Sequence, residues 1–213
     1  MPGGARGTPA FSAAVAATGK VAREAVTLRG KANMNVVMGA PSGLRRADPD
    51  YEAALIANAV LGQSALASRI GRRVRDTEGL SYSLASRFAF MEDLAGLWYV
   101  NINVAPQNLA KALRSTREEI EKYGQDGATD AEVEEQKSFF AGNYRVGLGS
   151  NGGIADALVT AERHGFGPAY LDKFPERIRA VTTAQANTAL RKHFFPERLH
   201  VIVGGDLDQL PEY

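Results

Sequence analysis

Residues 80–104, LSYSLASRFAFMEDLAGLWYVNINV, contain two runs in which apolar and polar side chains alternate. Such alternation has the period of a β-strand with one buried face. The residues that connect the runs, Met91 to Gly96, are few, which favours an antiparallel hairpin. The apolar positions are Leu80, Tyr82, Leu84, Phe88 and Phe90 in the first run, and Trp98, Val100, Ile102 and Val104 in the second.

Two more strands and two helices are predicted around this hairpin. Residues 33–38 (NMNVVM) and 198–204 (RLHVIVG) have the composition of strands. Before the hairpin, Asp48 and Pro49 have the residue types of a helix start, and Gly62 ends that helix. A second helix is expected to open at Ser64, to bury Leu66, Ile70 and Val74, and to end at Gly79.

Four helices are predicted between the hairpin and the last strand. The first ends at Gly124. Capping boxes open the second, at Thr129 and Glu132, and the fourth, at Thr182 and Gln185, which runs to about Phe195 before Pro196. Ser150 is expected to cap the third, with Ile154 and Leu158 on its apolar face.

The resulting order, β–α–α–β–β–α–α–α–α–β, is not a regular βα alternation. It predicts an α+β fold with a mostly antiparallel sheet and helices packed on one face. Residues 31–213 are interpreted as one domain, and residues 1–30 as an N-terminal linker or edge segment. At 213 residues the chain is long enough for a single core.

Composition excludes several classes of function. The formal net charge is +1, which does not indicate nucleic-acid binding or an anionic membrane surface. The chain has no cysteine, so disulfides, thiol nucleophiles and thiolate metal sites are excluded. No apolar run reaches the roughly 18 residues of a membrane span. We expect a soluble protein, and the sequence leaves a cytoplasmic and a periplasmic location both open.

The three histidines do not form a recognisable metal motif. The nearest approach is His193, Glu197 and His200, but Pro196 interrupts the segment, which therefore cannot be one helix. His164 precedes a glycine near a predicted helix end, where an imidazole suits the helix dipole. We expect no catalytic residue and no metal ligand in this chain, and no stoichiometric zinc in the purified protein.

Two segments resemble a known family of zinc peptidases. Residues 61–70 (LGQSALASRI) and 75–83 (RDTEGLSYS) resemble a pattern of the pitrilysin/insulinase-like metallopeptidases, in the half of the enzyme that lacks zinc. Residues 178–185 (IRAVTTAQ) and 201–206 (VIVGGD) are similar to later segments of that half. The resemblance covers about residues 33–208.

The resemblance implies the inactive half of a clamshell peptidase. In that family a zinc-bearing half with an HxxEH motif closes over a peptide, and the other half supplies an arginine and a tyrosine that contact the peptide. These would be Arg75 and Tyr82 here, as substrate-binding residues. Zinc is expected in the partner half, which belongs to the same polypeptide or to a separate subunit. This chain alone is expected to be inactive, and homo-oligomerisation is possible.

Other interpretations of these features stay open. Tyr82 shares the alternation of Leu80 and Leu84, so it can belong to the core. Arg75 can be a cation at a helix C-terminus. The alternative function is a catalytically inactive structural or assembly subunit with the same fold.

Overall fold

The computed structural model describes residues 21–89, 91 and 96–209. Residues 1–20 of the predicted N-terminal segment, Phe90, most of the hairpin loop and residues 210–213 lie outside the described residues.

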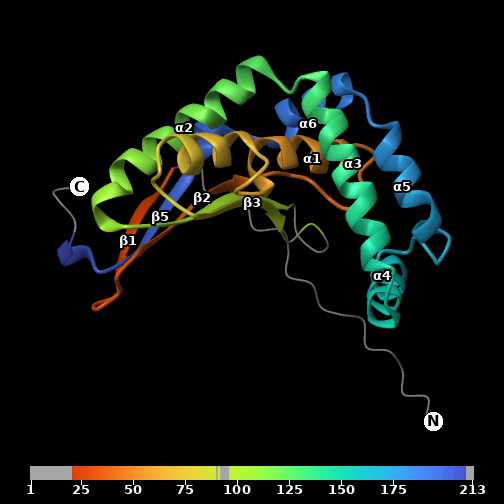
Figure 1. Ribbon diagram of the computed structural model, residues 1–213, viewed down its shortest axis with the longest axis horizontal. Coiled ribbons are helices and arrows are strands. Elements are labelled where there is room, and N and C mark those ends of the chain that lie inside the picture. The colour runs from red at the N-terminus through yellow and green to blue at the C-terminus, as the bar shows by residue number, and fades with distance from the viewer. Residues whose placement is uncertain (1–20, 90, 92–95, 210–213) are drawn as a thin grey trace, which may run out of the picture.

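A five-stranded sheet forms the base of the domain, in the order β1-β5-β2-β4-β3 (Figure 1). Every neighbouring pair is antiparallel except β1 and β5, which are parallel. The mostly antiparallel sheet and the β3–β4 pairing are therefore confirmed. The strands are β1 (Arg23–Thr27), β2 (Met34–Pro41), β3 (Ser83–Ala89), β4 (Leu97–Val104) and β5 (His200–Gly205).

The alternation of apolar and polar side chains determines which face of the sheet is buried. In β4, Trp98, Val100, Ile102 and Val104 are almost completely buried, whereas the residues between them are partly exposed. The neighbouring β2 has the same pattern, and its Met38 pairs with Val100. Burying one apolar face against helices removes it from water, which is the main favourable term in folding.

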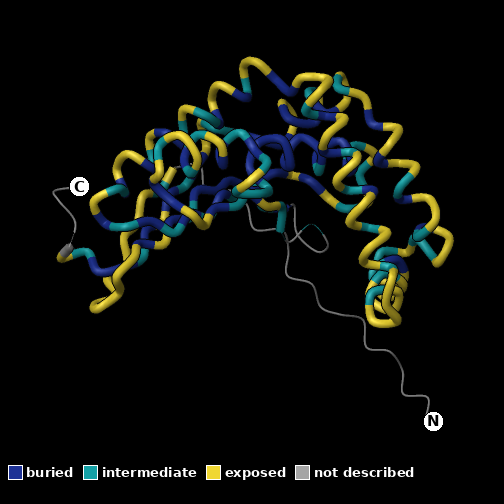
Figure 2. Tube along the Cα trace, in the orientation of Figure 1, coloured by how far each residue is buried: buried dark blue, intermediate teal, exposed yellow. Residues whose placement is uncertain are grey.

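The longer helices lie mainly on one side of the sheet (Figure 1), as predicted, and the buried positions gather where helices and sheet meet (Figure 2). A π-helical segment, η1, continues α1, and a second one, η2, precedes β3. The longer helices are α1 (Tyr51–Asn58), η1 (Ala59–Gln63), η2 (Gly71–Thr77), α2 (Leu109–Asp126), α3 (Asp130–Gly147), α4 (Asn151–Arg163), α5 (Tyr170–Ala180) and α6 (Thr183–His193). Three short 3₁₀ turns are η3 (Pro106–Asn108), η4 (Pro196–Arg198) and η5 (Leu207–Gln209).

Three of the predicted side-chain caps are present. Thr129 and Glu132 form a capping box at the start of α3, and Thr182 and Gln185 form another at α6. The Ser150 hydroxyl accepts a hydrogen bond from a backbone amide in the first turn of α4. These caps satisfy amides that have no partner within the helix, which is why they mark helix starts reliably.

One helix was not predicted. The expected four helices after the hairpin are five, because α5 lies between α4 and α6. Its sequence contains Pro175, and its N-cap position is Ala169, which offers no side-chain cap. Both features argue against a helix locally. Burial of Phe174 and Ile178 in the core provides the stabilisation that the local sequence lacks.

The two helices before the hairpin start later than predicted. Asp48 does not cap α1; its carboxylate accepts a hydrogen bond from the Arg45 amide and forms part of a turn, and α1 begins at Tyr51. The next helix begins at Arg69 and not at Ser64, and Leu66 is 68% exposed and not part of its apolar face. Local turns formed by Asp and Ser side chains compete with helix initiation here.

Two further details of the helices differ from prediction. α2 continues past Gly124 to Asp126 and ends where Gly127 takes a φ of 73°, which residues with a side chain rarely adopt. In α4, Ile154 and Leu158 are 40% and 38% exposed, so they do not form a buried stripe. Ala161 is the buried residue of that helix.

A buried polar cluster joins α1 to the hairpin. The side-chain oxygen of Asn58, Oδ1, accepts hydrogen bonds from the Trp98 indole at 2.8 Å and from the Ser86 hydroxyl at 2.7 Å. The Asn58 side-chain amide donates to the Ser86 carbonyl oxygen at 3.2 Å. A buried donor without a partner is costly, so this cluster specifies how α1 docks on β3 and β4.

Asn58→Leu is expected to lower the free energy of unfolding by about 2–4 kcal/mol, because it leaves the Trp98 N–H buried without a partner and the Ser86 hydroxyl with only the backbone carbonyl oxygen of position 58, at 3.4 Å. Urea denaturation followed by tryptophan fluorescence measures the loss. Asn151→Leu, at an exposed position of α4, is the control and is expected to change stability by less than about 0.5 kcal/mol. Equal losses in both variants would contradict the role of the cluster.

Candidate active-site segment between η2 and β3

Arg75 and Tyr82 lie on either side of the turn that joins η2 to β3. Arg75 is in the last turn of η2, where its guanidinium donates a hydrogen bond to the Asp76 carboxylate at 3.1 Å. Its side chain is 28% exposed. A cation at this position also suits the helix dipole.

The turn between the two residues has a defined backbone structure. The Gly79 amide donates to the Arg75 carbonyl oxygen at 3.1 Å, and the Leu80 amide donates to the Val74 carbonyl oxygen at 2.9 Å. Gly79 has a φ of 63°, which L-residues with a side chain rarely adopt. The bond from Gly79 to Arg75 is that of an αL cap, and the bond from Leu80 to Val74 closes the turn behind it, so the direction in which the chain leaves η2 is fixed.

Tyr82 points out of the core, which corrects one interpretation of the sequence. Its side chain is 82% exposed, and β3 begins only at Ser83, so the alternation predicted from residue 80 does not include Tyr82. The cause is Ser81, whose buried hydroxyl donates to the Asn103 carbonyl oxygen at 2.6 Å. Because Ser81 turns inward to bond β4, its neighbour Tyr82 is turned outward, and it is not a core residue.

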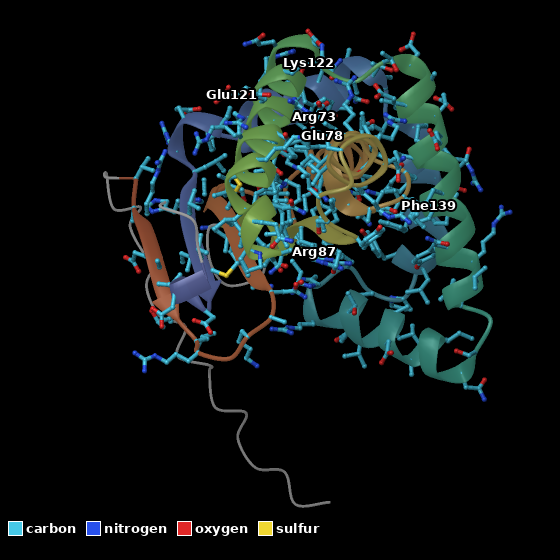
Figure 3. All side chains as sticks on the ribbon, turned by 60° about the vertical axis from the view of Figure 1, so that its left-hand side comes forward. Arg73, Glu78, Arg87, Glu121, Lys122 and Phe139 are labelled. Atoms are coloured by element: carbon cyan, nitrogen blue, oxygen red, sulfur yellow. The ribbon has the colours of Figure 1, made fainter. Side chains whose placement is uncertain are left out.

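Glu78 connects this turn to α2. Its carboxylate accepts hydrogen bonds from the Ser115 hydroxyl at 2.7 Å and from Arg73 at 3.1 Å, and Lys111 lies 3.6 Å away. Arg73 also pairs with Glu118 of α2, and Figure 3 shows Arg73 and Glu78 together beside that helix. Burial alone would raise the pKa of Glu78, but the hydrogen bonds from Ser115 and Arg73 lower it.

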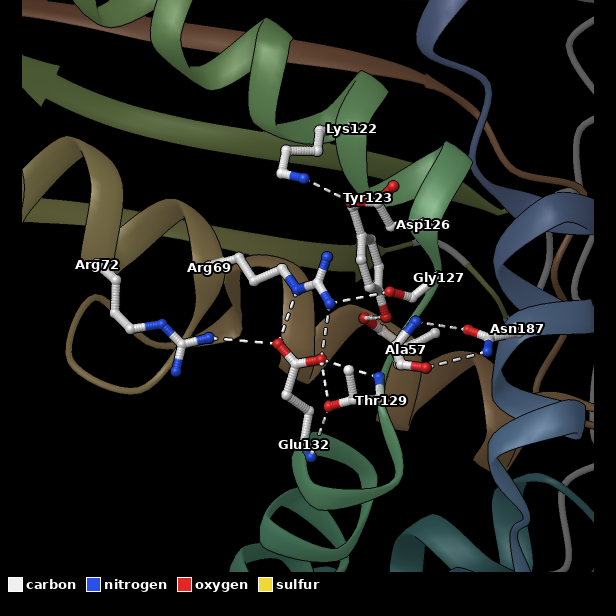
Figure 4. A network of polar contacts seen from close by, with 11 residues as sticks. Ala57, Arg69, Arg72, Lys122, Tyr123, Asp126, Gly127, Thr129, Glu132 and Asn187 are labelled. Atoms are coloured by element: carbon white, nitrogen blue, oxygen red, sulfur yellow. Dashed lines mark hydrogen bonds and ion pairs between the residues drawn. The ribbon is translucent and has the colours of Figure 1, made fainter.

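A second network holds the start of the same helical segment (Figure 4). Arg69 forms two hydrogen bonds with Glu132, both of 2.7 Å, and a third with the Gly127 carbonyl oxygen at 2.9 Å. Its guanidinium also lies over the Tyr123 ring, 4.7 Å from the ring centre. The Arg69 side chain is only 12% exposed, so this bidentate pair is largely shielded from water.

Glu132 receives further donors, and its pKa shows the effect. The Thr129 amide donates to it at 2.9 Å, and Arg72 lies 3.3 Å away. Burial would raise the pKa of Glu132, but the hydrogen bonds from Arg69 and Thr129 outweigh burial and lower the pKa from 4.5 to about 2. Glu132 was predicted from the sequence only as part of a capping box. Its partner Arg69 was missed, because sequence spacing does not reveal a contact between residues this far apart.

The histidines are separated by the fold. His193 is buried; its Nδ1 lies 2.9 Å from the Ser42 carbonyl oxygen and its Nε2 lies 3.0 Å from the Asp50 carboxylate. The His200 Nδ1 accepts a hydrogen bond from the Ala22 amide. Across residues 21–89, 91 and 96–209, no group of three His, Asp or Glu side chains is arranged to hold a metal ion. The described residues therefore do not fit a zinc site.

None of the helices within the described part of the chain has both the length and the apolar composition needed to cross a bilayer.

Comparison with known proteins agrees with this picture. Residues 11–140 match the family model described as the peptidase M16 inactive domain. An uncharacterized zinc protease of Streptomyces coelicolor is 27% identical over 157 residues, which is 74% of this chain and 34% of that protein. An uncharacterized zinc protease of Mycobacterium bovis is 28% identical over 140 residues, which is 66% of this chain and 32% of that protein. The chain thus spans about a third of these relatives.

Solved structures share the fold. A peptidase M16 inactive domain from Pseudomonas fluorescens superposes with a TM-score of 0.82 at 22% identity, covering 93% of this chain and 46% of that one. The inactive peptidase domain of a putative zinc protease from Bordetella parapertussis superposes with a TM-score of 0.67 at 17% identity. The match covers 83% of this chain and 94% of that one.

The chain therefore belongs to the peptidase M16 inactive-domain family. This confirms the resemblance found in the sequence. It also agrees with the absence of a suitable metal-binding group from the described residues, and it makes the chain a non-catalytic domain of a zinc-protease family.

The stability of the folded domain is expected to fall at acid pH, because Glu132 becomes protonated there. Because its pKa falls from 4.5 to about 2 on folding, its contribution is complete above the unfolded-state pKa and is lost as the pH falls from about 5 towards 2. The loss is on the order of 2–3 kcal/mol. Thermal unfolding between pH 7 and pH 2.5 measures it.

Glu132→Gln is expected to lower stability at pH 7 and to flatten this pH dependence. Glu135→Gln, an exposed neighbour in α3, is the matched control and should keep the wild-type profile. An unchanged profile in Glu132→Gln would show that the Arg69–Glu132 pair is not responsible.

Proposed function

We propose that this domain forms one wall of a peptide-binding chamber and supplies Arg75 and Tyr82 as hydrogen-bond donors to a bound peptide. A zinc-bearing HxxEH half, in the same polypeptide or in a separate subunit, would supply the metal and the catalytic groups. The observation that carries the proposal is the exposed phenol of Tyr82, 82% accessible beside a turn whose backbone is fixed. An exposed large aromatic held on a rigid segment is typical of a contact residue.

The chemistry of the two side chains suits a peptide carbonyl. A guanidinium and a phenol both donate hydrogen bonds without losing a proton first. Peptide hydrolysis develops negative charge on the scissile carbonyl oxygen, and fixed donors aimed at that oxygen stabilise the transition state. In this chain the two networks around Glu78 and Glu132 hold the segment that carries both donors, so little reorganisation is required.

Zinc chemistry is assigned to the partner half, because the described residues offer no suitable donor set. The metal there would activate water and polarise the carbonyl. The role of this chain is to bind and orient the peptide and to donate hydrogen bonds to its carbonyl oxygen. The relatives, which are named as zinc proteases, are about three times as long as the segment they share with this chain, which supports the need for a companion half.

Tyr82→Phe is expected to leave the domain folded and to lower the peptidase rate about 10²–10³-fold when the chain is combined with its zinc-bearing half. Arg75→Ala is expected to act more on substrate binding and to raise KM. An internally quenched peptide measures both constants, and the melting temperature reports folding.

Tyr99→Phe, on β4, is the matched control and is expected to keep full activity. If an active complex forms and neither Tyr82→Phe nor Arg75→Ala changes kcat or KM, the binding role fails. The chain would then be a structural or assembly subunit of the same fold.

A further inference from the structure

The strand β1 forms an open edge of the sheet. It pairs with β5 on one side, and within the described residues no strand pairs with its other side. All five residues of β1 are exposed. An edge of this kind presents unpaired amides and carbonyls to any extended chain that reaches it.

The direction of the free backbone groups follows from the bonds to β5. The Ala22 carbonyl accepts from Val201, and the Leu28 amide donates to Gly205. Successive residues of a strand direct their backbone groups to opposite sides, so the groups of Arg23, Ala25 and Thr27 point away from β5. The side chains of the same three residues lie on the helix-covered face, because Arg23 pairs with the buried Val201.

A groove of about 520 Å³ lies on that face, between the β1–β5 edge and α2. The helix lies over this part of the sheet in both views (Figures 1 and 3). Its apolar lining is formed by Met38, Ala110, Leu113 and Val201. Its cationic lining is formed by Arg23 from β1 and by Arg114 and Arg117 from α2.

Within the described part of the chain, the three arginines of the groove lack the carboxylate partners that several other arginines have. Arg69, Arg73 and Arg177 form ion pairs with carboxylates. Within the described residues no ion pair joins Arg23, Arg114 or Arg117 to a carboxylate. The one carboxylate that lines the groove, Glu118, is bound to Arg73. The net charge of the whole chain is only +1, so this positive charge is a local feature.

We propose that this edge binds an extended acidic peptide segment, which adds to β1 as a further strand and places alternate carboxylates beside Arg23, Arg114 and Arg117. The free backbone groups of β1 pair with the peptide backbone, and the alternation of side chains brings every second one to the groove. The apolar floor suits the aliphatic parts of these side chains. The site is separate from Arg75 and Tyr82, and it does not depend on the function proposed for them.

An acidic peptide fits better than other anions. Single-stranded nucleic acids require aromatic platforms, and no aromatic residue lines the groove. A small inorganic anion would use the guanidiniums but not the open backbone edge. The combination of an edge and cations spaced along a helix therefore selects an extended chain that carries carboxylates.

The test uses two fluorescein-labelled seven-residue peptides, one alternating Glu and Val and the other alternating Lys and Val. Fluorescence anisotropy with the full chain at low salt is expected to show binding of the Glu peptide only, and binding weakens as salt is added. Arg114→Glu/Arg117→Glu is expected to weaken binding by about tenfold or more, since it removes two attractive charges and adds two repulsive ones.

Arg87→Glu is the matched control, because Arg87 lies on β3 at the opposite edge of the sheet. It makes the same change in net charge as a single Arg114→Glu substitution and is expected to leave binding unchanged. Equal weakening by Arg87→Glu and by a single Arg114→Glu variant would show that only overall charge matters, and it would overturn the proposal.

Strand addition is tested separately from charge. A Glu–Val peptide with N-methyl groups on alternate amides cannot pair with β1 on its methylated side, so one of the two possible registers of methylation should abolish binding.

Ala25→Pro removes an outward amide from the edge and should weaken binding at an unchanged melting temperature. If both methylated peptides bind like the parent, or if inorganic triphosphate competes as well as the parent peptide, the site is a general anion surface and the proposal fails.

Discussion

The ion pair between Arg69 and Glu132 is the interaction on which the arrangement of the candidate site depends. The two side chains are only 12% and 17% exposed, so neither charge is stable there without the other. Glu132 also completes the capping box of α3, and Arg69 also binds the carbonyl that ends α2. One pair therefore fixes η2 against the junction of two other helices (Figure 4). The position from which the chain enters β3 follows from it.

The connection from this pair to Tyr82 is a series of short-range constraints. The Glu78 network holds the end of η2 to α2, Gly79 sets the direction of the turn, and Ser81 bonds the chain to β4. Each step uses a hydrogen bond or a backbone conformation that leaves few alternatives. Tyr82 is exposed because its neighbour must be buried, and an exposed aromatic side chain on a rigid segment is available for contact with a partner.

The described residues include no grouping of metal ligands, which agrees with membership of an inactive-domain family. The curated relatives extend far beyond the matched segment, whereas one solved relative is covered over 94% of its length. The fold is thus known both as part of a longer chain and as a unit of about this size. In the proposed roles such a domain contributes surfaces and fixed dipoles, and the open edge at β1 is separate from the η2–β3 segment.

Local sequence patterns were enough to predict the strands of the hairpin, β2 and β5, the helix caps at Thr129, Ser150 and Thr182, and, through residues 61–83, the family. These are local properties: alternation, capping and a contiguous motif depend on neighbours in the chain. Tertiary structure alone decided that α5 forms around Pro175, that Tyr82 leaves the alternation of β3, and that Arg69 meets Glu132. In each case a contact with a residue distant in sequence outweighs the local preference, and the energy of such contacts appears only when the chain has folded.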